Sequence, residues 1–237
     1  MDMQGQTFFI TGASSGMGAD TARLLGSRGA NVALAARRES ACADVAHEIE
    51  ASGGRALVLR MDVDREDDVR RAVAQAVEHF GRLDGAFNNA GLLGTGQPLH
   101  EMTTEAFEAV WRTNVMGVFW SMKHQIAAML QSGGGAIVNN ASIVAQIGFP
   151  GIAHYNASKH AVMGLTQTAA LEYFKQGIRV NAVLPGPVET PMALQGFGNR
   201  DNLQAMMSGS AAGRAGQPRE VAEVVAFLLS SGASYVS

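Results

Sequence analysis

A glycine-rich segment directly follows the first apolar run of the chain. That run, residues 6–11 (QTFFIT), predicts a buried strand. Gly12, Gly16 and Gly18 come next, and residues 16–28 have helical spacing. Glycines let a backbone turn tightly, and a helix N-terminus offers free N–H groups and a positive dipole end. The spacing is Gly-x3-Gly-x-Gly rather than Gly-x-Gly-x-x-Gly, so a plain turn stays an alternative to a pyrophosphate-binding loop.

The rest of the chain alternates between predicted strands and helices. This alternation is typical of an α/β fold with a doubly wound parallel sheet and helices on both faces. We expect one domain over residues 1–237, with a long irregular segment over 185–218 that contains a substrate loop at about 188–215. Strands are predicted over 31–36, 56–60, 85–88, 136–140 and 179–184, and helices over 39–51, 64–80, 103–130, 155–176 and 219–229.

Composition excludes several classes of function. The formal net charge is −3, which does not favour a nucleic-acid partner or an anionic membrane surface. No stretch has 18 uninterrupted apolar residues, and no targeting signal opens the sequence. Cys42 is the only cysteine, which leaves no intrachain disulfide and indicates a cytoplasmic protein. No cluster of His, Cys or Asp has the spacing of metal ligands, so we expect no catalytic metal.

The end of the second predicted strand lacks the acid that commonly holds a dinucleotide's ribose. Ala36 ends this strand, and Arg37 and Arg38 follow. Guanidinium groups bind phosphate in a bidentate manner, so the pair suits a 2′-phosphate, as in NADP. A solvated pair at a helix start is the alternative, although cations are unfavourable near a helix N-terminus.

Tyr155 and Lys159 are four residues apart at a predicted helix start, and therefore share one face. A phenol with a pKa near 10 must lose about three units to act as a base at neutral pH. One ammonium about 4 Å away supplies roughly that much, about 4 kcal/mol at an effective dielectric of about 20. The pair can thus form a tuned acid/base, and an ordinary tyrosine with a surface lysine is the alternative.

Further polar residues lie where predicted strands end. Ser142 comes just beyond the strand over 136–140, where a hydroxyl could donate to a substrate carbonyl oxygen. Residues 88–91 (NNAG) end the fourth strand. Asn114 lies inside the helix over 103–130, although asparagine is a poor helix former. Alternatively, Ser142 is an ordinary serine at the start of a loop, residues 88–91 form a plain turn, and Asn114 is a tolerated polar residue on the surface.

Taken together, these residues resemble the short-chain dehydrogenase/reductase family over about residues 7–236. The resemblance rests on the order and spacing of the glycine motif, Asp62-Val63, NNAG, Asn114, Ser142, Tyr155-x3-Lys159 and Pro185-Gly186 with Thr190. It implies a Rossmann-like fold and a nicotinamide-dependent alcohol/carbonyl oxidoreductase. It also implies NADP rather than NAD, because Arg37 is present and Ala36 is not an acid.

The resemblance implies a role for each matching residue. Tyr155 would be the acid/base, Lys159 would bind the ribose and lower the tyrosine pKa, Ser142 would polarise the carbonyl, and Asn114 would hold a water linked to Lys159. The implied cofactor-binding residues, which also include Tyr155 and Lys159, are Gly12, Ser14, Ser15, Gly16, Met17, Gly18, Arg37, Arg38, Asp62, Val63, Asn89, Ala90, Gly91, Pro185, Gly186, Val188 and Thr190.

The substrate and the assembly are less constrained. Leu92, Val144 and Ile147 are apolar and favour a small hydrophobic alcohol or carbonyl compound, unless they are ordinary packing. The family resemblance implies a homo-oligomer, dimer or tetramer, with the helices over 103–130 and 155–176 at an interface. Family members usually add a seventh strand, which the sequence up to Ser237 does not contain. Whether the sheet is complete and whether a tetramer forms are therefore not predicted. The alternative functions are an oxidoreductase that uses NAD(H), a family member that only senses the cofactor, and an enzyme of the family that catalyses a non-redox reaction.

Overall fold

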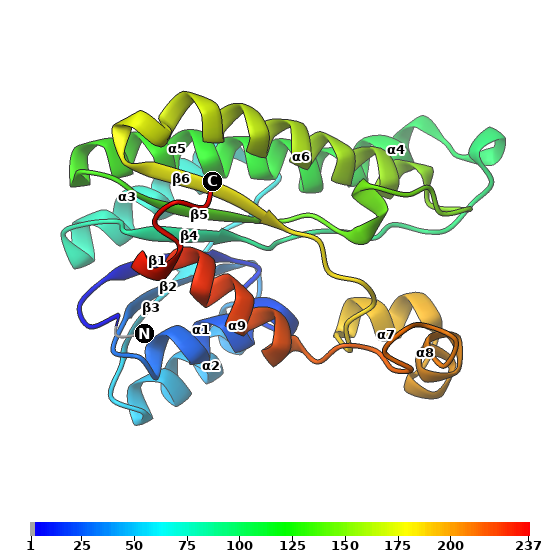
Figure 1. Ribbon diagram of the computed structural model, residues 1–237, viewed down its shortest axis with the longest axis horizontal. Coiled ribbons are helices and arrows are strands. Elements are labelled where there is room, and N and C mark those ends of the chain that lie inside the picture. Colours follow the sequence, from blue (N-terminus) through cyan, green and yellow to red (C-terminus); the bar gives the residue numbers. More distant parts are fainter. Residues whose placement is uncertain (1–2) are drawn as a thin grey trace.

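Six parallel strands form the central sheet of the computed structural model, which describes residues 3–237 (Figure 1). Their order across the sheet is β3-β2-β1-β4-β5-β6. Strand β1 pairs with both β2 and β4, so the direction of winding reverses at β1. The strands are β1 (Thr7–Thr11), β2 (Asn31–Ala36), β3 (Arg55–Arg60), β4 (Gly85–Asn88), β5 (Gly135–Asn140) and β6 (Ile178–Val183).

Helices cover both faces of the sheet (Figure 1). One apolar layer joins the sheet to α1, α2 and α9, and the other joins it to α3, α5 and α6. The helices are α1 (Gly16–Gly26), α2 (Glu39–Ala51), α3 (Glu66–Phe80), α4 (Thr104–Trp111), α5 (Gly117–Ser132), α6 (Ala153–Tyr173), α7 (Pro191–Phe197), α8 (Arg200–Met207) and α9 (Pro218–Leu229). Short 3₁₀ turns lie at Leu99–Glu101, Ile143–Ala145, Phe174–Gln176 and Ser231–Ala233.

Side chains along β1 alternate between these two layers. Phe8 and Ile10 pack with the layer of α1, α2 and α9, and Phe9 packs with the opposite layer. All three are 0–1% exposed. Burying such a side chain contributes about 1.5–3 kcal/mol, so a strand covered on both faces is strongly fixed in register. The predicted α/β fold with a doubly wound parallel sheet is confirmed.

Two predicted boundaries were wrong. The helix predicted over 103–130 is divided by a π-helical turn, Arg112–Met116, between α4 and α5. The segment predicted as irregular over 185–218 contains α7 and α8, whose first turns are capped by Thr190 and Asn199. Local caps stabilise these short helices, and the hydrophobic pattern alone does not indicate them.

The two ends of the segment with α7 and α8 are joined by a single parallel β-bridge. Val188 bridges to Gly216 in parallel, and Glu189 N donates to Gly216 O at 2.8 Å. The Glu189 side chain also pairs with Arg200 at the start of α8. The Val188–Gly216 bridge brings the two ends of the segment together, beyond the carboxyl end of β6 (Figure 1).

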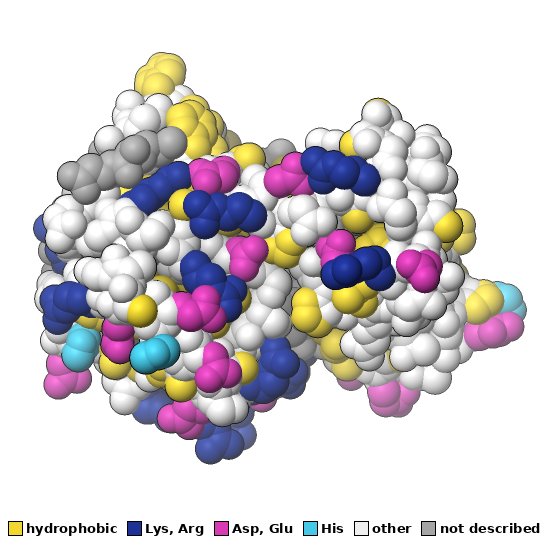
Figure 2. Space-filling model, turned by 90° about the horizontal axis from the view of Figure 1, so that it is seen from below, with side chains coloured by type: hydrophobic (Ala, Val, Ile, Leu, Met, Phe, Trp, Pro, Cys, Tyr) yellow, Lys and Arg dark blue, Asp and Glu magenta, His cyan; other side chains and the backbone are white. Residues whose placement is uncertain are grey.

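Charges of both signs are interspersed over the face that α1, α2 and α9 cover (Figure 2). Several of them are paired across helices. Arg28 of the α1–β2 turn bonds to Glu223 of α9 at 2.5 Å, and Arg23 bonds to Glu48 at 2.6 Å. No helix within residues 3–237 is both long and apolar enough to cross a membrane.

Candidate active site

The glycine turn after β1 packs against the end of β4. Asn89 Nδ2 donates to the carbonyl oxygens of Thr11 and Gly12, at 3.2 and 3.3 Å, and Thr11 Oγ1 accepts from the N–H groups of Asn89 and Ala90. Gly12 has φ +66°, and a Cβ there would lie 2.9 Å from Asn89 Nδ2. The close approach therefore requires glycine at position 12.

The N-terminus of α1 opens towards the β6–α7 connection. Ser15 is its N-cap residue, but the serine side chain makes no capping bond. A Cβ at Gly16 would lie 3.1 Å from Thr190 Cγ2, which places the turn next to that connection. The first N–H groups of a helix have no intrahelical partner and attract anions. The start of α1, which has no side-chain cap, is therefore a candidate to bind a pyrophosphate.

The two arginines that follow β2 have different surroundings. Arg38 donates to Ser14 Oγ at 2.9 Å and to Ser15 Oγ at 2.8 Å, and so holds the glycine turn. Arg37 instead lines a surface hollow of about 1240 Å³ along β3 and α3, together with Asp62. Both arginines are exposed, and Arg38 additionally bonds to the two serines of the glycine turn.

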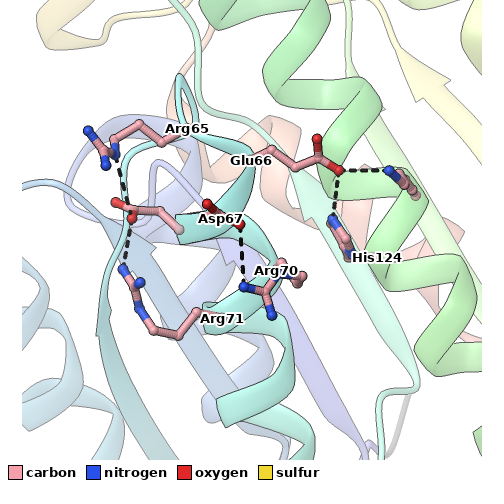
Figure 3. Close-up of polar contacts among 8 residues, drawn as sticks. Arg65, Glu66, Asp67, Arg70, Arg71 and His124 are labelled. Carbon is pink, nitrogen blue, oxygen red and sulfur yellow. Dashed lines mark hydrogen bonds and ion pairs between the residues drawn. The ribbon is translucent and has the colours of Figure 1, made fainter.

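Three of the charged side chains that line this hollow pair with one another (Figure 3). Asp68 pairs with Arg65 at 3.8 Å and with Arg71 at 2.7 Å. In contrast, Arg37 has no hydrogen bond or ion pair to other parts of residues 3–237. Its guanidinium group is thus available to an anion that enters the hollow.

The start of α6 brings the predicted acid/base pair together. Lys159 is 4% exposed, and its Nζ donates to the main-chain oxygen of Asn140 at 2.6 Å. The same Nζ lies 5.4 Å from the centre of the Tyr155 ring. Ser142, 9% exposed, follows β5 and begins a 3₁₀ turn that packs against α6. The tyrosine, lysine and serine therefore meet at the carboxyl edge of the sheet.

Burial controls the protonation of this pair. It raises the pKa of the Tyr155 phenol, and an interaction with the Ser142 side chain opposes that rise in part. It lowers the pKa of Lys159 to about 8. The tyrosine pKa is thus raised where a lowered one was expected, because burial removes the water that would hydrate the phenolate.

The pH dependence of stability should reveal the buried lysine. Between its pKa of about 8 in the folded chain and 10.5 in the unfolded chain, the unfolded chain binds more protons. The free energy of unfolding should therefore increase as the pH rises from 8 to 10.5, by at most about 1.4 kcal/mol per pH unit. Denaturant titrations at stepped pH measure this slope, and Lys159→Met serves as the comparison. Equal slopes in the two proteins would show that Lys159 does not contribute.

Asn114 lies in the π-helical turn and is 1% exposed, so it is not a tolerated surface residue. Its Oδ1 accepts from Leu92 N at 2.7 Å, and its Nδ2 donates to Leu92 O at 2.9 Å and to Ser158 Oγ at 3.0 Å. A π-turn interrupts the regular pattern of main-chain bonds, which is common at functional sites. The amide joins the segment after β4 to α6.

The other predicted residues surround the same edge. Asp62 accepts from Asp64 N at 3.1 Å after β3, and Val63 packs against Gly117. Pro185 accepts from Ile143 N at 3.0 Å, which holds the β6 loop beside Ser142. The structure thus brings together the residues predicted from the ends of β1, β3, β4, β5 and β6. The described residues 3–237 contain no group of three or more His, Cys, Asp or Glu that could hold a metal ion.

Asn88 belongs to the predicted NNAG segment, but the buried polar residues that bond around it, Asn139, Gln125 and Thr166, were not predicted from the sequence. Asn88 and Asn139 are opposite each other on β4 and β5, and Asn88 Nδ2 donates to Asn139 Oδ1 at 2.9 Å. Gln125 on α5 exchanges two bonds with Asn88, and Thr166 on α6 accepts from Asn139. Polar residues inside otherwise apolar strands were the available signal. This network fixes the register of the two strands that lead into the site.

The fold and the site together define a class of protein. A glycine turn lies where the strand order reverses, and a buried lysine lies beside a tyrosine at the same edge of a parallel sheet. In open α/β sheets, dinucleotides bind at this reversal point. The arrangement is that of a dinucleotide-binding oxidoreductase.

Comparison with known proteins identifies the family. The family model described as enoyl-(acyl carrier protein) reductase matches residues 12–237. The chain is 44% identical to a 2,5-dichloro-2,5-cyclohexadiene-1,4-diol dehydrogenase of Sphingobium indicum, over 100% of this chain and 94% of the relative. It is 45% identical to a cyclohexanol dehydrogenase of Acinetobacter sp., over 96% and 89%. A crystal structure of NAD⁺-bound xylitol dehydrogenase has a TM-score of 0.94 with 31% identity, over 100% and 96%. The chain belongs to the short-chain dehydrogenase/reductase family.

Proposed function

We propose that this protein is an NADP(H)-dependent dehydrogenase that interconverts a small alicyclic secondary alcohol and its ketone. The observation that carries the proposal is the buried Lys159 ammonium beside the Tyr155 ring, at the edge where Ser142 and the glycine turn meet. Burying a lysine ammonium costs free energy unless the charge interacts with another group. The position of Lys159 next to a phenol therefore favours acid/base chemistry.

Residues of this chain account for each proton and contact in the reaction. In the oxidative direction, Tyr155 takes the hydroxyl proton of the alcohol, while the Ser142 hydroxyl donates a hydrogen bond to the same oxygen. Lys159 favours the phenolate through its positive charge. A nicotinamide cofactor bound beside them would supply the acceptor for the hydride that leaves the alcohol carbon. In the reverse direction, Tyr155 returns the proton to the carbonyl oxygen.

The cofactor proposal uses the residues around the glycine turn. The uncapped start of α1 and the serines held by Arg38 would bind the pyrophosphate, and Asp62 and Val63 would lie at the adenine. Val188 and Thr190 would border the nicotinamide. The unpaired Arg37 favours a 2′-phosphate, and hence NADP over NAD. NAD remains the alternative, because the xylitol dehydrogenase of similar fold is NAD⁺-bound.

Apolar side chains around the site support an alicyclic substrate. Leu92 follows β4, Ile143 and Ile147 follow β5, and Met192 is in α7 after β6. These four side chains are 36–51% exposed. A substrate site bordered by such side chains would favour a ring with one hydroxyl over a polyol. Two relatives named for cyclohexanol and cyclohexadiene-diol dehydrogenation support the same class.

The proposed assembly is a homo-oligomer, and the proposed location is the cytoplasm. Phe119 and Leu130 on α5 and Leu171 on α6 are exposed, and these helices are expected at the interface of a homo-oligomer, dimer or tetramer. Cytoplasmic location is proposed from the single cysteine.

An activity panel tests the proposed function. The protein is incubated with cyclohexanol or xylitol and oxidised cofactor, or with an acyl-thioester ketone and reduced cofactor. Each reaction is run with NADP(H) and with NAD(H), and the absorbance of the reduced nicotinamide is followed. We expect cyclohexanol oxidation with NADP⁺, at a kcat/KM at least about tenfold above that with NAD⁺. Turnover of xylitol in preference to cyclohexanol would contradict the substrate class, and a preference for NAD⁺ would contradict the cofactor.

A further inference from the structure

The main chain of Tyr155 is held on both sides by buried side chains. Its N–H donates to Nδ1 of His154 at 2.8 Å, and its carbonyl oxygen accepts from Ser158 Oγ at 2.8 Å. Ser158 in turn accepts from Asn114. The carbonyl side is therefore anchored through Asn114, whereas the N–H side depends on His154.

The orientation and tautomer of His154 follow from its contacts. The side chain is 1% exposed, and Nδ1 accepts the Tyr155 N–H, so Nδ1 carries no proton. A neutral imidazole then carries its proton on Nε2. Nε2 is buried and has no hydrogen-bond partner among the described residues. Burying an unpaired N–H is unfavourable, so an apolar ring would fill the space better unless Nδ1 has a role.

His154 also touches the segment that Asn114 holds. A Cβ at Gly94 would lie 2.5 Å from His154 Nε2 and 2.7 Å from Val110, and Gly94 has φ +77°. Two residues earlier, both main-chain polar groups of Leu92 bond to Asn114. Residues 92–94 thus connect Asn114 to His154, on opposite sides of Tyr155.

We propose that His154 is a positioning residue that fixes Tyr155 through its Nδ1 atom. The first N–H groups of a helix have no intrahelical partner, and Ile152, the N-cap of α6, supplies no side-chain cap. Nδ1 satisfies the N–H of the residue whose phenol performs the acid/base step. This inference rests on the proposed function, because it assigns His154 an effect on that step. Displacing the phenol by about 1 Å would slow the reaction about 10²-fold.

Three substitutions separate the two nitrogens of the ring. His154→Asn places an acceptor oxygen near the position of Nδ1, and His154→Gln places one near Nε2. His154→Leu fills the space without an acceptor. His160→Leu is the matched control, because His160 lies on the same helix but is exposed. Each protein is measured for kcat with cyclohexanol and for NADPH affinity by fluorescence titration.

We expect His154→Leu and His154→Gln to lower kcat by about 10- to 100-fold, with NADPH affinity and the control unchanged. His154→Asn should stay within about threefold of the parent protein. If His154→Leu does not fold, the comparison of Asn with Gln decides. Equal kcat values for these two variants, or a better Gln variant, would overturn the role of Nδ1.

A second measurement does not depend on turnover. The Tyr155 amide should exchange with solvent at least about tenfold faster in His154→Leu or His154→Gln than in the parent or His154→Asn, as followed by NMR. If the parent protein turns over no alcohol, the proposed function fails, yet amide exchange still tests the contact. An unchanged exchange rate in both the Leu and Gln variants would overturn the proposal.

Discussion

Replacement of Tyr155 by phenylalanine should lower kcat for cyclohexanol oxidation by about 10²–10⁴-fold. Phenylalanine keeps the ring that packs beside Lys159 but removes the oxygen that would take the alcohol proton. Because burial raises the tyrosine pKa in this structure, the phenolate needs the nearby ammonium and the Ser142 hydroxyl. Steady-state rates with saturating NADP⁺ measure the loss.

Cofactor binding separates a chemical role from a structural one. Tyr155→Phe should bind NADPH within about twofold of the parent, because the Lys159–Asn140 bond and the glycine turn remain. Lys159→Ala should weaken both turnover and binding, since the lysine serves both. Parent-like turnover in Tyr155→Phe would show that the acid/base assignment is wrong.

The sheet could be predicted from sequence because its strands are covered on both faces. Residues 31–36 and 136–140 are short apolar runs next to turns, and each corresponds closely to a strand. Parallel strands end at one edge, so Ser142 and residues 88–91 could be placed together without coordinates. Tyr155 and Lys159 followed from helical periodicity.

Features that depend on side-chain caps or local main-chain geometry were not predicted. The π-turn at Asn114 has ordinary helical sequence on both sides, so periodicity does not indicate it. Helix α7 is short and is stabilised by Thr190 as its cap, which lies within a segment rich in glycine. The contact of His154 was not predicted either, because its partner is a main-chain N–H that no pattern of residues specifies.

The tyrosine pKa shows a different limit of sequence reasoning. The spacing of Tyr155 and Lys159 correctly places an ammonium near the ring, but says nothing of hydration. Burial acts on both groups and opposes charge on each, raising one pKa and lowering the other. Electrostatic balance at this site therefore depends on the enclosing loops and helices, and not on the pair alone.

Replacement of Arg37 by alanine should weaken NADPH binding by about 10- to 150-fold, and NADH binding by less than about twofold. A hydrogen bond to a charged group contributes about 1.5–3 kcal/mol, which corresponds to that range. Strand β2 ends at Ala36 rather than at an acid, and Arg37 lines the hollow after β2 without an ion pair of its own. Fluorescence titration with both reduced cofactors gives the two affinities.

Arg38→Ala provides the matched comparison, because it removes the same charge one residue away. Arg38 donates to Ser14 and Ser15, so its loss should disturb the glycine turn and weaken NADPH and NADH to a similar degree. A change in the ratio of the two affinities in Arg37→Ala alone would assign the 2′-phosphate to Arg37. If the ratio instead changes only in Arg38→Ala, then Arg38 binds the 2′-phosphate in the complex, after breaking its bonds to the two serines. A ratio unchanged in both variants means that neither arginine discriminates between the cofactors, and the proposed preference for NADP has no basis in this pair.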